Sequence, residues 1–453
     1  MTSAAKELGH AAKKSAFPDA GSRSAKLYER ALKVMPGGNS RTTVYFSPYP
    51  IYAERAAGSR VWDVDGVERI DLINNYSSLI HGHNHPKIVE AIVAQAQKLL
   101  SISLPTEAEV ELAEIITSRM PAVEQVRFCN SGTEGVMLAI KAARAFTGRA
   151  KIAKVEGAYH GSGDTAAVSV NPSPDKWGDP DAPASVAGAG SGPGAAADTV
   201  VIPMNDVENT RRILRKHAPD LAGVIIDPLV SSLGYVQVSP EFVDMLRAET
   251  KACGAMLIFD EVYSMRLGFN GAQGALGVKP DLTAMGKIIG GGLPVGAVGG
   301  RADIMSLFDP RAHAKVSHGG TFNANPMTMA AGAAAMKLFD KAAFDRLSML
   351  GDRLRAGLRE AVKIARVPGT VGGNTSMTSL FHVDTNAQTY RDLVASRRSN
   401  AQAGVRADKF FRYMLNHGVL MGAPGLFVLS TAVTEDEIDH TIDTALAALR
   451  TME

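Results

Sequence analysis

Short runs of consecutive apolar residues alternate with amphipathic stretches through the middle of the chain. The amphipathic stretches, at about 132–146, at 207–217 and after the Ser239-Pro240 pair, have the spacing of helices. Uninterrupted apolar runs are typical of strands buried on both faces, so the alternation predicts an α/β fold with a mostly parallel sheet covered by helices on both sides. The predicted strands are 125–130, 151–157, 199–204, 223–228, 255–262, 281–287 and 295–301.

The regions on either side of this central part have other patterns. Thr106 and Glu109 have the spacing of a capping box and predict a helix from there to about Arg119. An alanine-rich apolar stretch at 325–340 predicts a long buried helix, and from about 341 the order becomes helix, strands, helix. Since 453 residues are too many for one ordinary hydrophobic core, we expect this C-terminal part to form a smaller α+β unit.

Composition and charge narrow the class of protein. The 48 basic and 46 acidic residues leave a net charge of +2, which gives no electrostatic reason to expect binding to nucleic acid or to an anionic membrane. No apolar run reaches the length of about 18 residues that a membrane span needs, and residues 1–24 lack the apolar core of a signal peptide. The two cysteines, Cys129 and Cys253, fit no metal spacing, and reduced thiols favour a cytoplasmic location.

Residues 161–198 are rich in glycine, alanine, proline, serine and aspartate. The sequence GAGSGPG within them is similar to a dinucleotide-binding loop, but no strand is predicted before it and no helix after it, so we exclude that function. A structureless loop of this length in a compact domain is usually an active-site lid or a disordered segment. Because it directly follows Tyr159, we expect a mobile lid.

Lys287 is the one charged residue in the sequence LTAMGKIIGGGLPVG, residues 282–296. A nucleotide-binding P-loop would need glycine at position 281 and serine or threonine at position 288, where the chain has Asp281 and Ile288. Two interpretations of the lysine remain open. Its side chain extends from a strand end to solvent, or burial keeps its amine neutral, so that it attacks a carbonyl and forms a Schiff base.

Polar side chains directly follow two of the other predicted strands. Asp260 and Glu261 end an apolar strand, where a carboxylate serves as a metal ligand, as a helix cap or as a partner for a cationic ring nitrogen. Ser131, Gly132 and Thr133 lie between a strand and a helix, where backbone amides and hydroxyls form an anion site or cap the helix. The sequence alone leaves these alternatives open.

Aromatic and histidine side chains form two further groups. Tyr159 and His160 follow the strand at 151–157, where an aromatic ring stacks on a planar ligand or packs in the core. His81, His83 and His85 have the alternate spacing of a metal site, but no cysteine or carboxylate stands among them. We therefore expect a turn here and no metal.

Taken together, these features match the requirements of pyridoxal 5'-phosphate. That cofactor needs a lysine that forms a Schiff base, an aspartate at a strand end, a phosphate-sized nest of amides and an aromatic ring for stacking. The cofactor then carries the carbanion chemistry, while the protein supplies binding and electronic tuning.

The chain resembles the class III, fold-type I pyridoxal-phosphate aminotransferases. It is most similar to the branch that contains glutamate-1-semialdehyde aminomutase and the β-amino acid transaminases. The motifs that carry the resemblance run in the family's order from about residue 28 to the C-terminus. They are PGGNSR, GHNHP, NSGTEG, GAYHG, FDEV, GKIIGGGLPVGAVGG and GGTFNANPMTMAAG.

The resemblance implies a role for each residue at a matching position. Lys287 would form the Schiff base, and Asp260 would pair with the pyridinium nitrogen and keep it protonated. Val262 and Tyr159 would pack on opposite faces of the ring. The other residues expected to bind the cofactor are Ser131, Gly132 and Thr133 at its phosphate, together with His160 and Asp227.

The resemblance also implies an assembly and a domain organisation. Thr321 would reach the cofactor phosphate of the neighbouring subunit, which makes the protein a homodimer. The segment 161–198 matches the gating loop of the aminomutases in place and length. We expect residues 76–334 to form the large cofactor-binding domain, residues 335–453 the small domain, and residues 1–75 an N-terminal segment that joins the small domain.

The chain departs from the family pattern at several positions. Asp227-Pro228 stands where Glu-Pro is usual, and residues 263–266 replace the usual Thr-Gly or Ser-Gly pair. NSRTTVYFSPYP near the N-terminus and GAPGLFVLSTAVTEDEID near the C-terminus are more similar to the β-amino acid transaminases. The latter sequence lacks the acidic residue that aminomutases carry nearby. These differences concern the substrate and leave the cofactor chemistry in place.

Arg41 and Tyr76 are the expected substrate contacts. Arg41 follows a Pro-Gly-Gly break and has no acidic residue beside it, so its guanidinium either grips a substrate carboxylate or lies exposed in a loop. We therefore expect an aminotransferase that moves an amino group between an amino acid, with β-amino acids as candidates, and a keto acid by a ping-pong mechanism. The alternatives are an isomerase of the glutamate-1-semialdehyde 2,1-aminomutase type and a binding protein without enzymatic activity.

Overall fold

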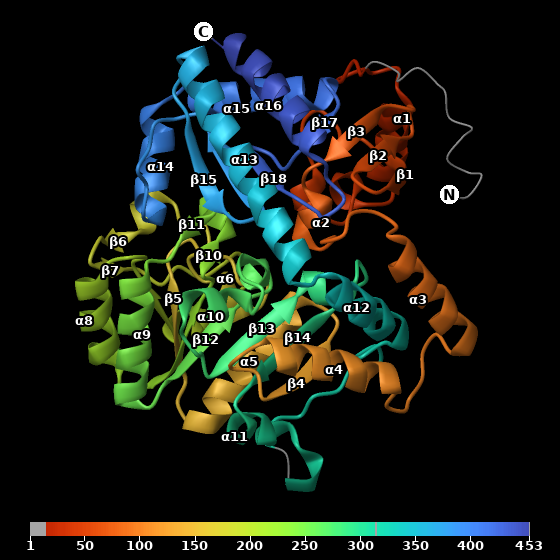
Figure 1. Cartoon of the computed structure of the whole chain (residues 1–453). Helices are drawn as coiled ribbons and strands as arrows, with labels where there is room; N and C mark the ends of the chain where they lie inside the picture. Colours follow the sequence, from red (N-terminus) through yellow and green to blue (C-terminus); the bar gives the residue numbers. More distant parts are fainter. Residues whose placement is uncertain (1–14, 313–314, 453) are drawn as a thin grey trace.

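The computed structural model describes residues 15–312 and 315–452, so most of the stretch 1–24 discussed above lies outside the described residues. Figure 1 shows a lower part built around a large sheet and an upper part that holds both ends of the described chain. The long helix α13 (Lys341–Ala365) runs from the upper part to the boundary between the two.

The lower part contains a seven-stranded sheet in the order β4-β14-β13-β12-β9-β5-β8. Only β14 runs antiparallel to its two neighbours, and the other strands of the sheet all point the same way. The predicted mostly parallel α/β sheet is therefore confirmed. In sheet order the strands are Gln125–Cys129, Gly296–Gly300, Leu282–Gly286, Met256–Asp260, Leu221–Ile226, Lys151–Val155 and Thr199–Ile202.

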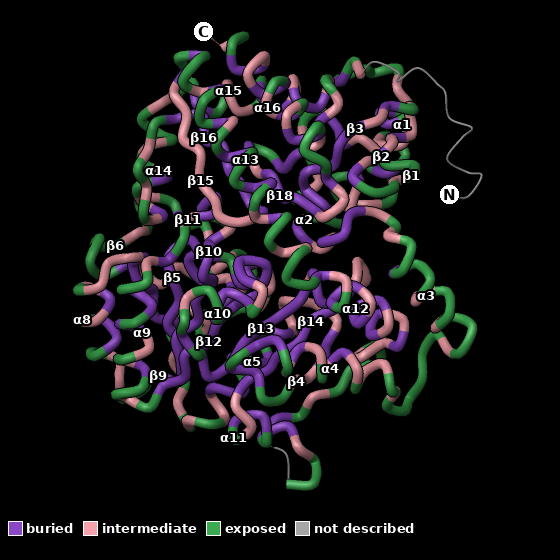
Figure 2. Tube along the Cα trace, viewed as in Figure 1, coloured by how far each residue is buried: buried purple, intermediate pink, exposed green. Residues whose placement is uncertain are grey.

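Helices cover both faces of this sheet. Successive residues of each strand point to opposite faces, so an uninterrupted apolar strand packs against helices on both. On β12, Met256 and Ile258 belong to the core beneath α5 (Gly132–Thr147), whereas Leu257 and Phe259 pack with residues of α8 and α9. This double burial explains the uninterrupted apolar runs in the sequence. The covering helices on the second face are α8 (Val207–His217), α9 (Pro240–Cys253), α4 (Glu107–Arg119) and α12 (Pro326–Leu338), with α3 (Pro86–Lys98) outside α12. Figure 2 shows the buried strands running through the middle of this part.

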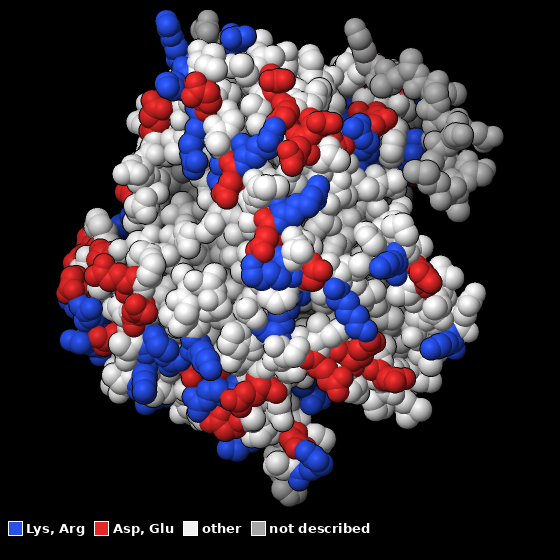
Figure 3. All heavy atoms as spheres, viewed as in Figure 1, with Lys and Arg blue, Asp and Glu red and all other residues white. Residues whose placement is uncertain are grey.

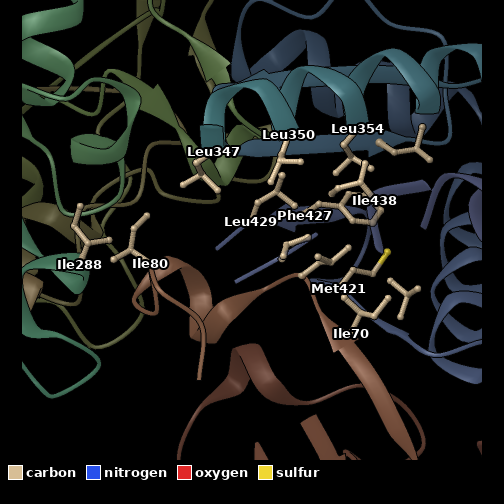
Figure 4. Close-up of a cluster of buried hydrophobic side chains, with 14 of the residues drawn as sticks. Ile70, Ile80, Ile288, Leu347, Leu350, Leu354, Met421, Phe427, Leu429 and Ile438 are labelled. Carbon is tan, nitrogen blue, oxygen red and sulfur yellow. The ribbon is translucent and has the colours of Figure 1, made fainter. Parts of the chain in front are cut away.

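The upper part combines segments from both ends of the chain. In a four-stranded sheet, β17 near the C-terminus pairs in parallel with β3 near the N-terminus. Figure 4 shows Leu347, Leu350 and Leu354 of α13 directed towards Phe427 and Leu429. The elements of this part are α1 (Arg23–Leu32), β1 (Ala53–Ala57), β2 (Arg60–Asp63), β3 (Glu68–Asp71), β15 (Thr370–Asn374), β16 (Met377–Phe381), α14 (Tyr390–Ser399), α15 (Ala403–Asn416), β17 (Val419–Leu420), β18 (Leu426–Val428) and α16 (Glu435–Arg450).

Several local predictions need correction. Helix α4 begins after Thr106 as predicted, but the Thr106 side chain makes no capping hydrogen bond, so the capping box is wrong. The segment 161–198 is not structureless, and a short helix begins within the end of its glycine-rich sequence. It contains α6 (Asp164–Ala167), the hairpin of β6 (Gly178–Asp179) and β7 (Ala182–Pro183), and α7 (Pro193–Ala197). Helix α12 continues through the domain boundary expected between 334 and 335 and ends at Leu338.

The remaining short elements connect the larger ones. They are α2 (Asn74–Ser77), β10 (Leu229–Val230), β11 (Val236–Gln237), α10 (Gly271–Leu276) and α11 (Ala302–Met305). Among the described residues, no helix has the length and apolarity to cross a membrane. Basic and acidic side chains are interspersed over the face drawn in Figure 3, in keeping with the net charge of +2.

Candidate active site

A cavity of about 730 Å³ opens at the carboxyl edge of the large sheet. Strands β4, β5, β9, β12 and β13 all end at this edge, where open α/β sheets place their ligands. The residues that follow these strands therefore meet although they are far apart in the sequence. The predicted site residues that line the cavity are Arg41, Tyr76, Ser131, Gly132, Thr133, Tyr159, His160, Asp227, Asp260, Val262 and Lys287.

Lys287 reaches into this cavity from the end of β13 rather than out to solvent. Its backbone has a φ of 49°, and Gly291 and Gly292 further along the loop also have positive φ. Such a conformation is strained for a non-glycine residue and is found mostly at functional sites. Burial lowers the pKa of the Lys287 amine, although Asp260 and Asp227 attract the charged form. Of the two interpretations left open by the sequence, a desolvated amine is the one that the structure supports.

Asp260 and Glu261, adjacent in sequence, point to different surroundings. Asp260 lies in the cavity wall, where its carboxylate accepts hydrogen bonds from the Val262 amide (3.1 Å) and from His160 Nδ1 (2.9 Å). Glu261 accepts from the amides of Ala272 and Gln273 at the start of α10, so it is a helix cap. Burial raises the pKa of Glu261 to about 7. The described residues contain no cluster of three or more metal-ligating side chains.

Asp227 stands at the end of β9, next to the strand that ends in Asp260. One of its oxygens accepts a hydrogen bond from the Leu229 amide (3.1 Å). Burial, and then the neighbouring Asp260 carboxylate, raise the pKa of Asp227 well above its usual value. Two close carboxyl groups in a buried site do not both ionise readily. Burial and the neighbouring carboxylate thus both favour the protonated form of Asp227.

The loop between β4 and α5 forms a small nest of backbone amides. Ser131 caps α5, because its hydroxyl accepts a hydrogen bond from the Glu134 amide (3.2 Å). Capping accounts for this hydroxyl, whereas the amides of Gly132 and Thr133, in the first turn of the helix, have no hydrogen-bond partner in the described chain. A Cβ on Gly132 would lie 2.7 Å from the Val262 side chain, so the nest and Val262 are in close contact. This arrangement fits a phosphate beside a flat ring.

Aromatic and cationic side chains complete the wall of the cavity. Tyr159 is 51% exposed and free to stack on a ligand, while His160 behind it is 1% exposed. Arg41 Nη1 donates a hydrogen bond to Asn75 Oδ1 (2.7 Å), and the Tyr76 hydroxyl donates to the carbonyl of Thr43. The sequence thus brings these residues together at one site. Thr321 is exposed and does not line the cavity of its own chain.

Several cavity residues were not predicted from the sequence, among them Ser231, Ser232 and Tyr263. Ser231 and Ser232 come from the turn after β10, and Ser232 donates a hydrogen bond to the Gly157 carbonyl (2.8 Å). Tyr263 follows Val262, and its ring lies under the amine of Lys287. The departures from the family pattern at 227–228 and 263–266, which lie close by in the sequence, were the available signal for all three.

The three histidines of HGHNHP lie away from the cavity wall. His81 contacts Thr431 and the carbonyl of Ala335, and His83 contacts Asp71, each at hydrogen-bonding distance. His85 stands at the N-terminus of α3. Although Asp71 supplies a carboxylate that the sequence did not suggest, these residues form no metal cluster in the described chain.

The segment 161–198 lies beside the cavity and is held by hydrogen bonds from Lys154 and Arg391. Lys154 Nζ donates hydrogen bonds to the carbonyls of Ala158 (2.9 Å) and Val168 (2.6 Å). Arg391 of α14 pairs with Glu156 and also donates to the carbonyls of Trp177 and Gly178. This segment is thus fastened to both the sheet and α14.

Comparisons with known proteins agree with this site. The family model for class-III aminotransferases matches residues 44–450. A glutamate-1-semialdehyde 2,1-aminomutase 2 from Bacillus pumilus is 38% identical over 93% of this chain and 96% of its own length. An omega-transaminase structure from Sphaerobacter thermophilus is 47% identical over 95% of this chain and 98% of that chain, with a TM-score of 0.90.

Two further structures are informative. A transaminase with pyridoxal phosphate bound is 44% identical, covers 94% of this chain and 97% of that chain, and has a TM-score of 0.86. A β-phenylalanine aminotransferase from Variovorax paradoxus is 35% identical, covers 95% of this chain and 93% of that chain, and has a TM-score of 0.83. The expected cofactor and enzyme class are thus confirmed, and the non-enzymatic alternative is not. The chain belongs to the class-III aminotransferases, enzymes of the fold-type I architecture that work with pyridoxal 5'-phosphate.

Proposed function

We propose that Lys287 carries the cofactor covalently through its Nζ atom and moves the proton during amino transfer. The observation that supports this most strongly is the meeting of a desolvated lysine, a strand-end carboxylate and an amide nest in one cavity. When bound, the cofactor withdraws electrons from the carbon that loses its proton. The neutral Lys287 amine accepts that proton and returns it to the carbon on the other side of the transferred nitrogen, and general acid–base transfer of this kind contributes on the order of 10²–10⁴ in rate.

The other cavity residues hold and orient the cofactor. Asp260, aligned by the Val262 amide and His160, is proposed to face the ring nitrogen and keep it protonated. Ser131, Gly132 and Thr133 are proposed to hold the phosphate at the N-terminus of α5. Val262 and Tyr159 would enclose the ring, and Asp227, with its raised pKa, would face the ring as a neutral carboxyl.

We infer that the substrates are an amino acid and a keto acid, with β-amino acids as the favoured donors. Arg41 would bind the substrate carboxylate with Tyr76 beside it, because both line the cavity and among its described lining residues Arg41 holds the one guanidinium. The similarity to structures named as an omega-transaminase and a β-phenylalanine aminotransferase supports this choice.

The second candidate is an isomerase of the 2,1-aminomutase type, which the similarity to curated aminomutases favours. Both candidates use the same lysine and differ in where the amino group goes. A transaminase needs an external keto acid to complete its cycle, whereas an aminomutase does not. Glutamate-1-semialdehyde converted in the absence of any acceptor would decide for the isomerase.

We further propose that the enzyme is a cytoplasmic homodimer. Leu100, Leu104 and Phe322 are exposed by 62%, 70% and 60%. Large apolar side chains exposed close together often mark a protein–protein interface. Asn325 donates a hydrogen bond to the Leu100 carbonyl (3.2 Å), so the stretches that carry these residues meet on the surface. Thr321 in the same loop would then reach the partner's cofactor phosphate. Analytical sedimentation should give the mass of a dimer. Thr321→Val should weaken cofactor binding without dissociating the dimer.

The decisive experiment is reductive trapping of the cofactor with borohydride, followed by peptide mapping. Wild-type protein should carry the adduct on Lys287, and Lys287→Ala should lose both the adduct and nearly all amino transfer. Lys279→Ala, which removes an exposed lysine, is the control and should behave as wild type. An adduct found on another lysine in the Lys287→Ala protein would rule out the assignment.

A further inference from the structure

Tyr263 lies directly under the amine of Lys287. The Nζ atom of Lys287 is 4.9 Å from the centroid of the Tyr263 ring, within the range over which an aromatic face attracts an ammonium group. Tyr263 comes from the end of β12, three residues after Asp260, and lines the same cavity. The pair therefore belongs to the reacting part of the site.

The position of the Tyr263 ring is fixed from behind. Its hydroxyl lies 2.9 Å from the hydroxyl of Tyr235, and the two ring centroids are 5.8 Å apart. Tyr235 is 2% exposed and packs in a core cluster with Ile73, Leu229 and Val428. The hydroxyl contact and the buried Tyr235 thus hold the Tyr263 ring in its place beside Lys287.

The charged and titratable groups around Lys287 define what this ring can do. Burial disfavours the ammonium form, and the carboxyl groups of Asp260 and Asp227 oppose that effect. Burial favours the protonated form of Asp227, and Asp260 is proposed to be engaged by the cofactor nitrogen. The face of Tyr263 then remains as a group that favours the ammonium over the neutral amine, because a ring quadrupole attracts a cation and not an uncharged nitrogen.

We propose that Tyr263 is a positioning residue that receives the ammonium of Lys287 and holds its Nζ in place between the two proton transfers. The proton from the substrate carbon goes to the lone pair of Nζ, the resulting ammonium rests on the ring face, and the same proton leaves for the second carbon. The ring forms and breaks no bond. This inference rests on the proton-transfer role proposed above for Lys287.

The test measures the amine itself in cofactor-free protein. Competitive labelling with acetic anhydride across a pH series, read by mass spectrometry, gives the pKa of Lys287. Tyr263→Leu should lower that pKa by about 0.5–1 unit, which raises the labelling rate in the acid range roughly 3- to 10-fold. Tyr263→Phe should lie between wild type and Tyr263→Leu, and Tyr235→Phe, which removes the hydroxyl contact but keeps both rings, should give a smaller decrease than Tyr263→Leu.

A second series guards against misfolding of the leucine variant. Phenylalanine analogues with one to five ring fluorines at position 263 keep the shape of the ring while progressively removing the negative charge of its face. The pKa of Lys287 should fall steadily along the series, and the acid limb of the half-reaction rate should move to lower pH with it. A pKa that does not change along the series would overturn the proposal. The two tests are independent because labelling needs no cofactor. An unchanged pKa would not affect the assignment of Lys287 as the cofactor-binding residue, and a failure of reductive trapping would not affect the labelling result.

Discussion

The Nδ1 atom of His160 lies 2.9 Å from Oδ2 of Asp260, and both side chains are buried at the carboxyl end of the large sheet. A carboxylate only accepts, so the histidine donates from Nδ1. Burial lowers the pKa of His160, which keeps the ring neutral and leaves a lone pair on Nε2. Within the described part of the chain, Nε2 has no hydrogen-bond partner. His160 thus orients Asp260 without neutralising its charge.

Asp260→Asn should bind the cofactor and react poorly. Loss of a charge-assisted hydrogen bond costs roughly 1.5–3 kcal/mol, so cofactor affinity should fall about 10- to 150-fold. The rate of the first half-reaction should fall further, because the ring nitrogen loses the charge that keeps it protonated. Cofactor titration and stopped-flow absorbance measure the two quantities. Glu261→Gln, at the next residue but on the α10 cap, should change stability instead; near-normal turnover in Asp260→Asn would contradict the assignment.

His160→Leu should act through Asp260. The carboxylate keeps the Val262 amide but loses its second donor, so we expect a smaller loss of affinity than in Asp260→Asn. In the double variant the two effects should not add, and the coupling should reach about 0.5–3 kcal/mol. Cofactor dissociation constants for the four proteins of the cycle give this value. Full additivity would mean that the two side chains act separately.

Arg41→Ala should raise KM for amino acids and leave cofactor loading unchanged. The guanidinium is exposed and pairs with the neutral amide of Asn75, so a substrate carboxylate meets no competing anion there. Removing the contact should cost roughly 2–4 kcal/mol, towards the lower end because water reaches the site. Amines without a carboxylate are the control substrates and should be unaffected, and Arg41→Lys should recover only part of the affinity. Equal losses for both substrate types would assign Arg41 to the fold or the dimer.

The segment 161–198 should be released when Arg391 is removed. Arg391 joins α14 to the buried Glu156 and to the hairpin region at Trp177 and Gly178. Arg391→Ala should therefore speed amide exchange in residues 171–184 about 10-fold or more, the effect of losing about 1.5 kcal/mol of charged hydrogen bonding. Lys409→Ala, which removes an exposed cation on α15, is the control. If substrate failed to protect the segment in the wild-type protein, the lid interpretation would be wrong.

The residues that line the site could be predicted from the sequence more fully than the contacts that surround it. Asp260 and Lys287 could be placed because parallel strands present their carboxyl ends at one edge, a rule that depends only on the order of apolar runs. The antiparallel direction of β14 could not be predicted, since the apolar pattern of a buried strand is the same whichever direction the strand runs. Arg391 and Glu156 are 235 residues apart and each looks like an ordinary surface charge, so only the folded chain reveals the pair.

A buried histidine in the small upper part should make the protein sensitive to acid. His382 is 3% exposed, neither ring nitrogen has a hydrogen-bond partner among the described residues, and its ring lies 4.9 Å from that of Phe410. Burial, aided by the charge of Arg406, lowers the pKa of His382 to about 4. The unfolded chain binds a proton near pH 6.5 and the folded chain does not, so the free energy of unfolding falls as the pH drops from about 6.5 to 4.

His382→Leu should remove this contribution. The full difference corresponds to roughly 3 kcal/mol, and His81, whose pKa burial also lowers to about 4, keeps part of the acid slope. Between pH 7 and pH 5, urea unfolding should show a smaller loss of stability for His382→Leu than for wild type. At pH 7 the two proteins should differ little, because the histidine is mostly neutral in both the folded and the unfolded state. His440→Ala, an exposed histidine on α16, should keep the wild-type slope. An unchanged difference between pH 7 and pH 5 in His382→Leu would show that His382 is protonated within the folded protein.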